Sequence, residues 1–164
     1  MSEADFYEPV KECLERSFTN VGRAVYLEVA ARKGFSETAK RAIPDGREIV
    51  FAFLRRKPDI LGFTEGQYTK SLITAEVKEG SLTLDDIYQA KLYKEVFDAA
   101  YGFLITVAPI QEEIKRLCKR TFNILHSAGD YRQFLAIAQF DSAGRQLLDW
   151  VEEDPFQKAH YWNS

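Results

Sequence analysis

The sequence contains little cysteine and little histidine, with two of each in 164 residues. Cys13 and Cys118 lie in apolar helical patterns and lack the C-x-x-C spacing of a zinc or redox site, so we expect two buried free thiols and no disulfide. His126 and His160 stand alone, in loop-like or terminal context. These absences exclude a zinc centre built on cysteine and histidine.

Long apolar runs are also missing. No segment approaches the length that crosses a bilayer, and the N-terminal MSEADFYEPVKE is acidic and polar where a signal peptide is basic and then apolar. We therefore expect a cytoplasmic protein without a membrane partner.

The chain has no excess of positive charge. Its formal net charge is −3, which argues against a protein that coats nucleic acid through bulk charge, so any such contact must be local. Two basic clusters are present. The second, on a predicted helix, is typical of a solvated helix face. The first adjoins the stretch discussed below, and for it phosphate contact and a solvated face are equally good interpretations. The first cluster is Arg55, Arg56 and Lys57, and the second is Lys115, Arg116, Lys119 and Arg120.

Repeats, low-complexity tracts and Pro/Gly/Ser linkers are absent, and 46% of the residues are hydrophobic. This composition predicts one soluble domain over residues 1–155, followed by a frayed polar tail over 156–164.

The first half of the chain predicts a helix and then strands. The helix begins near Asp5, with Glu8 completing a capping box, and ends near residue 18. Residues 23–30, 47–54, 59–63 and 71–78 are rich in branched and aromatic side chains and predict strands, with a short helix or loop over 36–46.

The strands at 59–63 and 71–78 predict an antiparallel hairpin with its tip near Gly66 and Gln67. In that register opposite residue numbers sum to about 135, so Asp59 faces Glu76. A slip of one residue would place the two carboxylates on opposite faces of the sheet.

In the second half, Thr83 and Asp86 form a plausible N-cap pair for a helix that extends to about residue 99. The strand at 101–107 is apolar on both faces, which indicates a parallel crossover and hence an α/β sheet covered by helices. A helix over about 110–127 and a hairpin that turns at Asp141 to Gly144 complete the prediction.

The chemistry centres on the two predicted hairpin strands. Glu76 and Lys78 are two residues apart on one strand, so their side chains share a face, while Ala75 and Val77 point into the core. If Asp59 converges on Glu76, the two carboxylates repel unless a hard cation such as Mg²⁺ lies between them. A divalent metal with a nearby lysine suits phosphodiester hydrolysis.

The pattern resembles the PD-(D/E)XK, or restriction-endonuclease-like, nuclease superfamily, in its small predicted-nuclease type. The motif is carried by Pro58, Asp59, Glu76, Val77 and Lys78. The resemblance covers residues 1 to about 107 and implies a core of helix, antiparallel strands, crossover helix and parallel strand, with the C-terminal helix and hairpin as additions. Many members also carry Q-x-x-x-Y on the helix that follows, matched here by Gln89 and Tyr93 on one helix face.

The resemblance implies a role for each matching residue. Mg²⁺, or Mn²⁺ as a substitute, would be held by Asp59, Glu76 and the Val77 carbonyl, and Lys78 would assist the attacking water. Gln89 and Tyr93 would position the phosphate or the metal site, and the first basic cluster is nearest for backbone contact.

The first helix supplies an acidic ligand in many members. Glu3, Glu8 and Glu12 are candidates here, and the opening EADFYEPVKECL favours Glu3, which shares the apolar side of the helix with Tyr7. Against this, Glu3 precedes the predicted helix start, where an acidic residue commonly complements the helix dipole.

The implied activity is metal-dependent hydrolysis of nucleic acid, with DNA as the expected substrate, an endonucleolytic cut and a homodimer as the expected assembly. The alternative is a catalytically silent member that binds nucleic acid or a protein. Asp59 could also merely cap a turn, and Glu76 with Lys78 could be a strand-end ion pair. A third reading is that the resemblance is wrong and the chain is an unrelated α/β domain, which a large separation between Asp59 and Glu76 would reveal.

Overall fold

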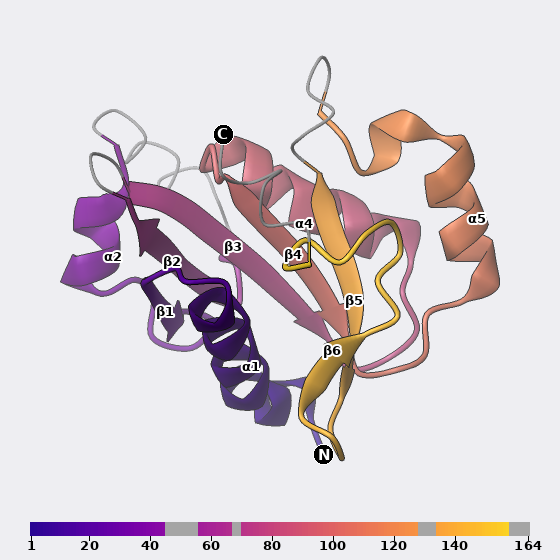
Figure 1. Ribbon diagram of the computed structural model, residues 1–164, viewed down its shortest axis with the longest axis horizontal. Helices are drawn as coiled ribbons and strands as arrows, with labels where there is room; N and C mark the ends of the chain where they lie inside the picture. Colours follow the sequence, from indigo (N-terminus) through magenta and orange to yellow (C-terminus); the bar gives the residue numbers. More distant parts are fainter. Residues whose placement is uncertain (45–55, 67–69, 128–133, 158–164) are drawn as a thin grey trace.

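The computed structural model describes residues 1–44, 56–66, 70–127 and 134–157 and shows a six-stranded sheet flanked by helices (Figure 1). The predicted mixed α/β class is confirmed. The strands follow one another across the sheet in chain order, and their bounds are β1 Val25–Val29, β2 Ile60–Glu65, β3 Lys70–Lys78, β4 Tyr101–Thr106, β5 Leu135–Asp141 and β6 Gln146–Leu148.

The sheet has an antiparallel half and a parallel centre. β1, β2 and β3 pair antiparallel, β3, β4 and β5 pair parallel, and β6 returns antiparallel to β5 as the predicted terminal hairpin. Ile60 pairs with Ala75, so the predicted register of the first hairpin is confirmed. Every residue of β4 is buried, as expected for a strand reached by a crossover helix.

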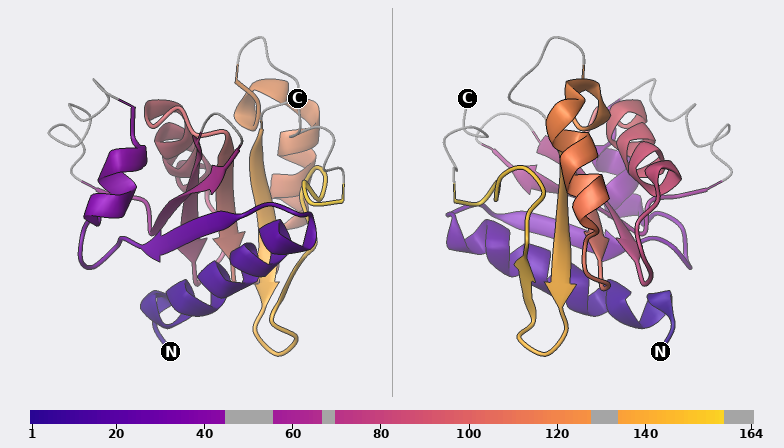
Figure 2. Two further views of the ribbon diagram at one scale, coloured as in Figure 1. Left: turned by 60° about the vertical axis from the view of Figure 1, so that its left-hand side comes forward. Right: turned by 90° about the vertical axis from the view of Figure 1, so that its right-hand side faces the viewer.

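Helices cover both faces of this sheet. Figure 2 shows α1 on one side and α4 and α5 on the other. Val10, Leu14 and Phe18 of α1 share a core cluster with Ala75 and Val77 of β3, whereas α4 also contributes to a second cluster against β2 and β3. The helical elements are η1 Glu3–Phe6, α1 Tyr7–Asn20, α2 Glu37–Ala42, α4 Leu84–Val96, α5 Glu112–Arg120 and η2 Phe122–Ile124.

The helical segment at the N-terminus begins earlier than predicted. Asp5 accepts a hydrogen bond from the main-chain N–H of Ser2 at 2.7 Å and completes a capping box with that residue, so the predicted box between Asp5 and Glu8 is wrong. Pro9 falls in the first turn of α1, where a missing N–H costs nothing. Glu3 consequently lies inside the helical segment.

The predicted helix over 110–127 is interrupted. α5 ends at Arg120 because Thr121 is extended, with φ −123° and ψ 92°, and the short η2 follows. His126 then forms an isolated bridge with Phe134. The break directs Ile124 and Leu125 into the core, where both are buried.

The predicted strand at 47–54 lies wholly outside the described residues, and only residues 156 and 157 of the predicted tail are described. At the start of the predicted tail, the Phe156 ring stacks on Phe103 with centroids 5.8 Å apart and meets Phe18 edge-on at 5.0 Å, so the chain is still packed on the core there. Cys13 and Cys118 are free and buried, as predicted. Among the described helices, none combines the length and the apolar character that a bilayer span requires.

Candidate active site

Asp59 and Glu76 lie across from each other where β2 begins and β3 approaches its end. The register Ile60–Ala75 brings the two residues to adjacent strands, and the main-chain N–H of Asp59 donates to Glu76 Oε1 at 3.2 Å. Their exposed fractions are 7% and 4%. Two carboxylates therefore share one buried corner of the sheet, as the predicted register required.

The main chain of β3 orients one of these carboxylates. The Val77 N–H donates to Asp59 Oδ2 at 2.8 Å. In an extended strand the N–H and C=O of one residue point to the same side, so the Val77 carbonyl also points toward the Asp59 side of β3. The Val77 side chain packs in the core cluster on the α1 face, as the alternation predicted.

Burial and mutual repulsion make the carboxylate pair reluctant to hold two negative charges. Burial, followed by the charge of Asp59, raises the pKa of Glu76 to about 9, and the nearby Lys78 ammonium opposes that shift. Burial likewise raises the pKa of Asp59, while the Val77 N–H lowers it. The pair therefore retains a proton at neutral pH unless additional positive charge is supplied.

Lys78 lies two residues beyond Glu76 on the same strand and face. Its Nζ is 3.6 Å from Asp86 Oδ1. The other Asp86 oxygen, Oδ2, accepts from the Thr83 main-chain N–H at 2.9 Å and from its hydroxyl at 3.0 Å, which closes the predicted cap of α4. The first turn of α4 thus anchors the ammonium group beside the acidic pair.

Glu3 reaches the pair from the N-terminal helical segment. The Tyr7 hydroxyl donates to Glu3 Oε1 at 3.3 Å and also interacts with Asp59. Burial, then the charges of Asp59 and Glu3, raises the pKa of Tyr7, so its hydroxyl remains a donor between two acids. Of the three candidate glutamates, Glu3 lines the hollow above the acidic pair, whereas Glu8 contacts Lys11, with Glu8 Oε2 3.5 Å from the ammonium group.

Gln89 and Tyr93 lie one above the other on α4. The Gln89 amide donates to the Tyr93 hydroxyl at 3.2 Å, and its carbonyl accepts from Arg56 at 3.5 Å. Tyr93 is 1% exposed and packs in the core, whereas Gln89 lines the same hollow as the acids. This contact orients the Gln89 amide and links α4 to the segment that precedes β2.

These side chains surround a hollow of about 410 Å³, which we call the acidic pocket. Ala31 and Tyr7 also line it. Val77 adjoins the pocket through its main chain, Tyr93 lies beneath Gln89, and Arg55 falls outside the described residues. The predicted site residues that line it are Glu3, Arg56, Lys57, Asp59, Glu76, Lys78 and Gln89.

The acidic pocket suits a cation that needs few protein ligands. Across residues 1–44, 56–66, 70–127 and 134–157, no three His, Cys, Asp or Glu side chains are already grouped around a metal position. Mg²⁺ keeps several waters and commonly uses one or two carboxylates. Asp59 and Glu76 match that requirement, and a cation between them would remove the repulsion that raises the pKa of Glu76.

Sequence reasoning did not assign Tyr7 or Asp86 to this site. The signal for Tyr7 was its position four residues after Glu3, which places both on one helix face. Asp86 had been identified as a cap residue, and its contact with Lys78 depends on how α4 packs against β3.

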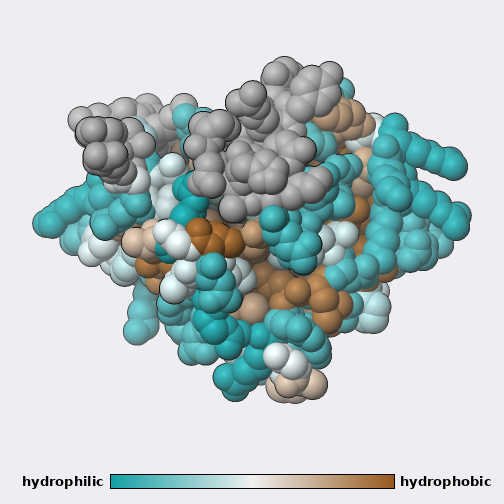
Figure 3. All heavy atoms as spheres, in the orientation of Figure 1, coloured by the Kyte–Doolittle hydropathy of each residue, from teal (hydrophilic) through white to brown (hydrophobic). Residues whose placement is uncertain are grey.

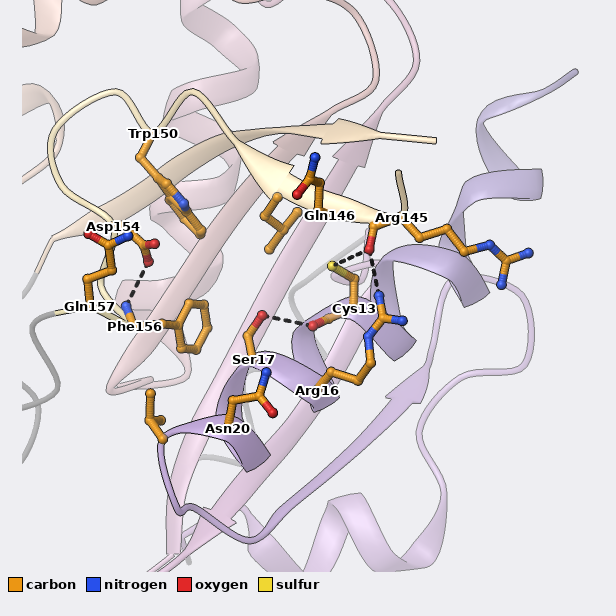
Figure 4. Close-up of a pocket in the computed structure, with 12 residues that line it drawn as sticks. Cys13, Arg16, Ser17, Asn20, Arg145, Gln146, Trp150, Asp154, Phe156 and Gln157 are labelled. Atoms are coloured by element: carbon orange, nitrogen blue, oxygen red, sulfur yellow. Dashed lines mark hydrogen bonds between the residues drawn. The ribbon is translucent and has the colours of Figure 1, made fainter. Parts of the chain in front are cut away.

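A separate hollow of about 380 Å³ lies between α1 and the segment that follows β5 (Figure 4). Arg16 Nη2 donates to the Arg145 carbonyl at 2.6 Å, and Cys13 Sγ lies 3.6 Å from the same oxygen. Trp150 and Phe156 form its other wall. These contacts fasten β6 to α1 and contain no counterpart of the acidic pair.

Comparisons of the chain with protein-family models, with curated proteins and with solved structures gave no match.

Proposed function

We propose that this protein is a Mg²⁺-dependent nuclease of the PD-(D/E)XK type that hydrolyses phosphodiester bonds, with DNA as its substrate and an endonucleolytic cut. The observation that carries the proposal is the buried pair of Asp59 and Glu76, which shares its pocket with Lys78. Burying two acids together is costly for folding, and a ligand that needs both of them explains why the cost is retained.

The order and pairing of the elements support the proposed family core. A helix precedes an antiparallel pair, β2 and β3, and α4 then leads to β4, which lies parallel to β3. The P-D and E-x-K residues fall at the adjoining ends of β2 and β3, and Gln89 lies on the helix that follows. These positions support the proposed family core.

Each pocket residue has a distinct task in this proposal. Asp59 and Glu76 would hold the metal together with the Val77 carbonyl, and Glu3 would add a carboxylate from the N-terminal segment. When bound, Mg²⁺ would supply charge stabilisation and acidify a water. Lys78 would stabilise negative charge as it develops on the phosphate.

Three further residues would orient the substrate. Arg56 and Lys57 line the same pocket as the acids and carry positive charge toward a bound phosphate. Gln89, held by Arg56 and Tyr93, presents its amide at the pocket wall.

A catalytically silent binding module is the second candidate. The high pKa of Glu76 favours it, because a protonated Glu76 can share the buried corner with Asp59 without any metal. In that case the fold would bind its partner with Glu76 protonated, and neither metal binding nor cleavage would be measurable.

Calorimetry with Mn²⁺ separates the two candidates. We expect wild type to bind Mn²⁺ and Glu76→Ala to lose binding, while Glu79→Ala, an exposed acid three residues along, binds as wild type. Cleavage of single-stranded, duplex and branched DNA in Mg²⁺ should follow the same pattern. Absence of both binding and cleavage in wild type would favour the silent module.

A further inference from the structure

A second hollow adjoins the acidic pocket. It has a volume of about 370 Å³ and lies between α1, β1 and the turn that follows β1. Tyr7 lines both hollows, so the two adjoin at its side chain. We call it the basic hollow, because three cationic side chains line it, Lys11, Arg32 and Lys33, against two acidic ones, Glu8 and Glu28.

Both acids of the basic hollow are already engaged. Glu8 Oε2 lies 3.5 Å from Lys11 Nζ, which is also 2.7 Å from Glu15. Glu28 accepts from the Tyr26 hydroxyl at 3.1 Å, from the Ser36 main-chain N–H at 3.0 Å and from the Ser36 hydroxyl. Neither carboxylate forms an ion pair with the two cations of the turn.

Arg32 and Lys33 project from this turn and are exposed. Within the part of the chain that the structure describes, no carboxylate lies within ion-pair distance of either one. The turn is closed by a hydrogen bond from the Gly34 N–H to the Ala30 carbonyl at 3.1 Å. Asp5 is near enough to interact electrostatically with Arg32, but among the described residues neither Arg32 nor Lys33 is held in an ion pair.

Gly34 is the point at which this turn contacts Lys57, a residue of the acidic pocket. Its φ is +72°, which favours glycine, and a Cβ there would lie 2.9 Å from Lys57 Nζ. Lys57 itself lines the acidic pocket, so its ammonium group rests on the turn that carries Arg32 and Lys33. The close approach gathers three cations around one loop.

We propose that the basic hollow is a subsite for the phosphodiester backbone of a nucleic-acid strand, next to the phosphate held at the acidic pair. The strand would cross Tyr7, and Arg32 and Lys33 would neutralise its neighbouring phosphates. This inference rests on the proposed function, because it takes the acidic pocket as the reacting end of the same groove. Contacts of this kind position the backbone and carry no base sequence.

The competing surface is the basic cluster of α5. Arg116, Lys119 and Arg120 are exposed there, and hydrophilic side chains cover α5 on the right of Figure 3. Lys115 is already paired with Asp149 at 2.8 Å. α5 lies on the opposite side of the sheet from α1 (Figure 2), and α1 is the helix that begins at Tyr7. This cluster therefore provides a control of equal charge.

Salt-dependent binding tests the subsite. Every protein would carry Glu76→Ala so that cleavage does not consume the probe, a fluorescein-labelled oligonucleotide used single-stranded and as a duplex. Anisotropy titrations at several salt concentrations would compare this parent with Arg32→Gln/Lys33→Gln and with Lys119→Gln/Arg120→Gln. We expect the turn variant to lower the slope of log affinity against log salt by about one for each lost contact, and the α5 variant to leave it unchanged.

Each outcome bears on the proposal in one direction. An unchanged slope in the turn variant, or an equal loss in both variants, overturns the subsite while leaving the nuclease proposal in place. Loss in the α5 variant instead moves the strand to the other face. If the parent binds neither probe although wild type binds Mn²⁺, the subsite is overturned and the metal site stands. Thermal unfolding of each variant checks that the exposed substitutions leave the fold intact.

Discussion

The main-chain N–H of Val77 donates to the Asp59 carboxylate at 2.8 Å, across the gap between β3 and the start of β2. The two residues are 18 apart in the sequence. The hydrogen bond continues the antiparallel pairing of the two strands through the Asp59 side chain. Because it engages Oδ2, it leaves Oδ1 for the pocket. The Asp59 carboxyl group therefore both stabilises the strand pair and is a candidate metal ligand.

Asp59 should therefore show separable effects on stability and on metal binding. Asp59→Asn keeps an oxygen that can accept from Val77, so we expect it to fold normally and to lose most of its Mn²⁺ affinity. Asp59→Ala leaves a buried N–H without an acceptor and should cost about 1–3 kcal/mol of unfolding free energy. Urea unfolding and calorimetry measure the two effects. Equal stability of both variants would contradict the structural role.

Glu76 should make the protein less stable as pH rises. Its folded pKa of about 9 lies above the ordinary value of 4.5, so the folded state holds the extra proton and unfolding releases it between these pH values. The resulting contribution to stability is complete below about pH 4.5 and is lost as pH rises toward 9, by up to about 1.4 kcal/mol per pH unit.

Glu76→Gln replaces the ionisable carboxyl by a neutral amide, so the pH-dependent loss of stability disappears. The variant should therefore be more stable than wild type at about pH 8 while losing Mn²⁺ binding. Urea unfolding at about pH 6 and pH 8 gives the comparison, and the gap between the two proteins should widen with pH. A gap that stays the same at the two pH values would show that Glu76 is already ionised in the folded protein.

The Tyr7 hydroxyl should position Glu3 for metal binding. Tyr7→Phe removes the donor that holds Glu3 at 3.3 Å, so we expect weaker Mn²⁺ binding by several-fold, with little further loss when Glu3→Gln is added. Tyr26→Phe is the matched control, because it removes the hydrogen bond from Tyr26 to Glu28 at 3.1 Å outside the acidic pocket. Additive losses for Tyr7→Phe and Glu3→Gln would separate the two residues.

Lys78 should affect cleavage more than metal binding. Lys78→Met removes positive charge beside the acidic pair, so Mn²⁺ should bind at least as tightly, while the rate of DNA cleavage falls by about a hundredfold or more. Lys40→Met is the control, since Lys40 pairs with Glu37 at 3.6 Å on the surface. A parallel loss of Mn²⁺ binding and cleavage in Lys78→Met would place the residue in a supporting role for the metal site.

Local pattern in the sequence was sufficient for much of the fold. The alternation around Glu76 and the loop at Gly66 predicted the register that brings Asp59 across from it, because side chains of a strand alternate with a period of two and the hairpin length limits the pairing. Thr83 with Asp86 predicted the start of α4, since a cap is satisfied within four residues. The apolar sequence of residues 101–107 likewise predicted that β4 is buried on both faces.

Other features were decided by contacts between distant segments. The contact of Tyr7 with Asp59, the anchoring of Lys78 by Asp86 and the approach of Lys57 to Gly34 each join elements whose relative placement no local pattern contains. The end of α5 at Arg120 is of the same kind. Burying Ile124 and Leu125 in the core stabilises the chain more than further turns of α5 would. Sequence periodicity therefore determined which faces are buried and which residues could meet at the strand ends. Tertiary packing determined the depth of the acidic pair, and with it the pKa of Glu76, because desolvation depends on every layer that covers the group.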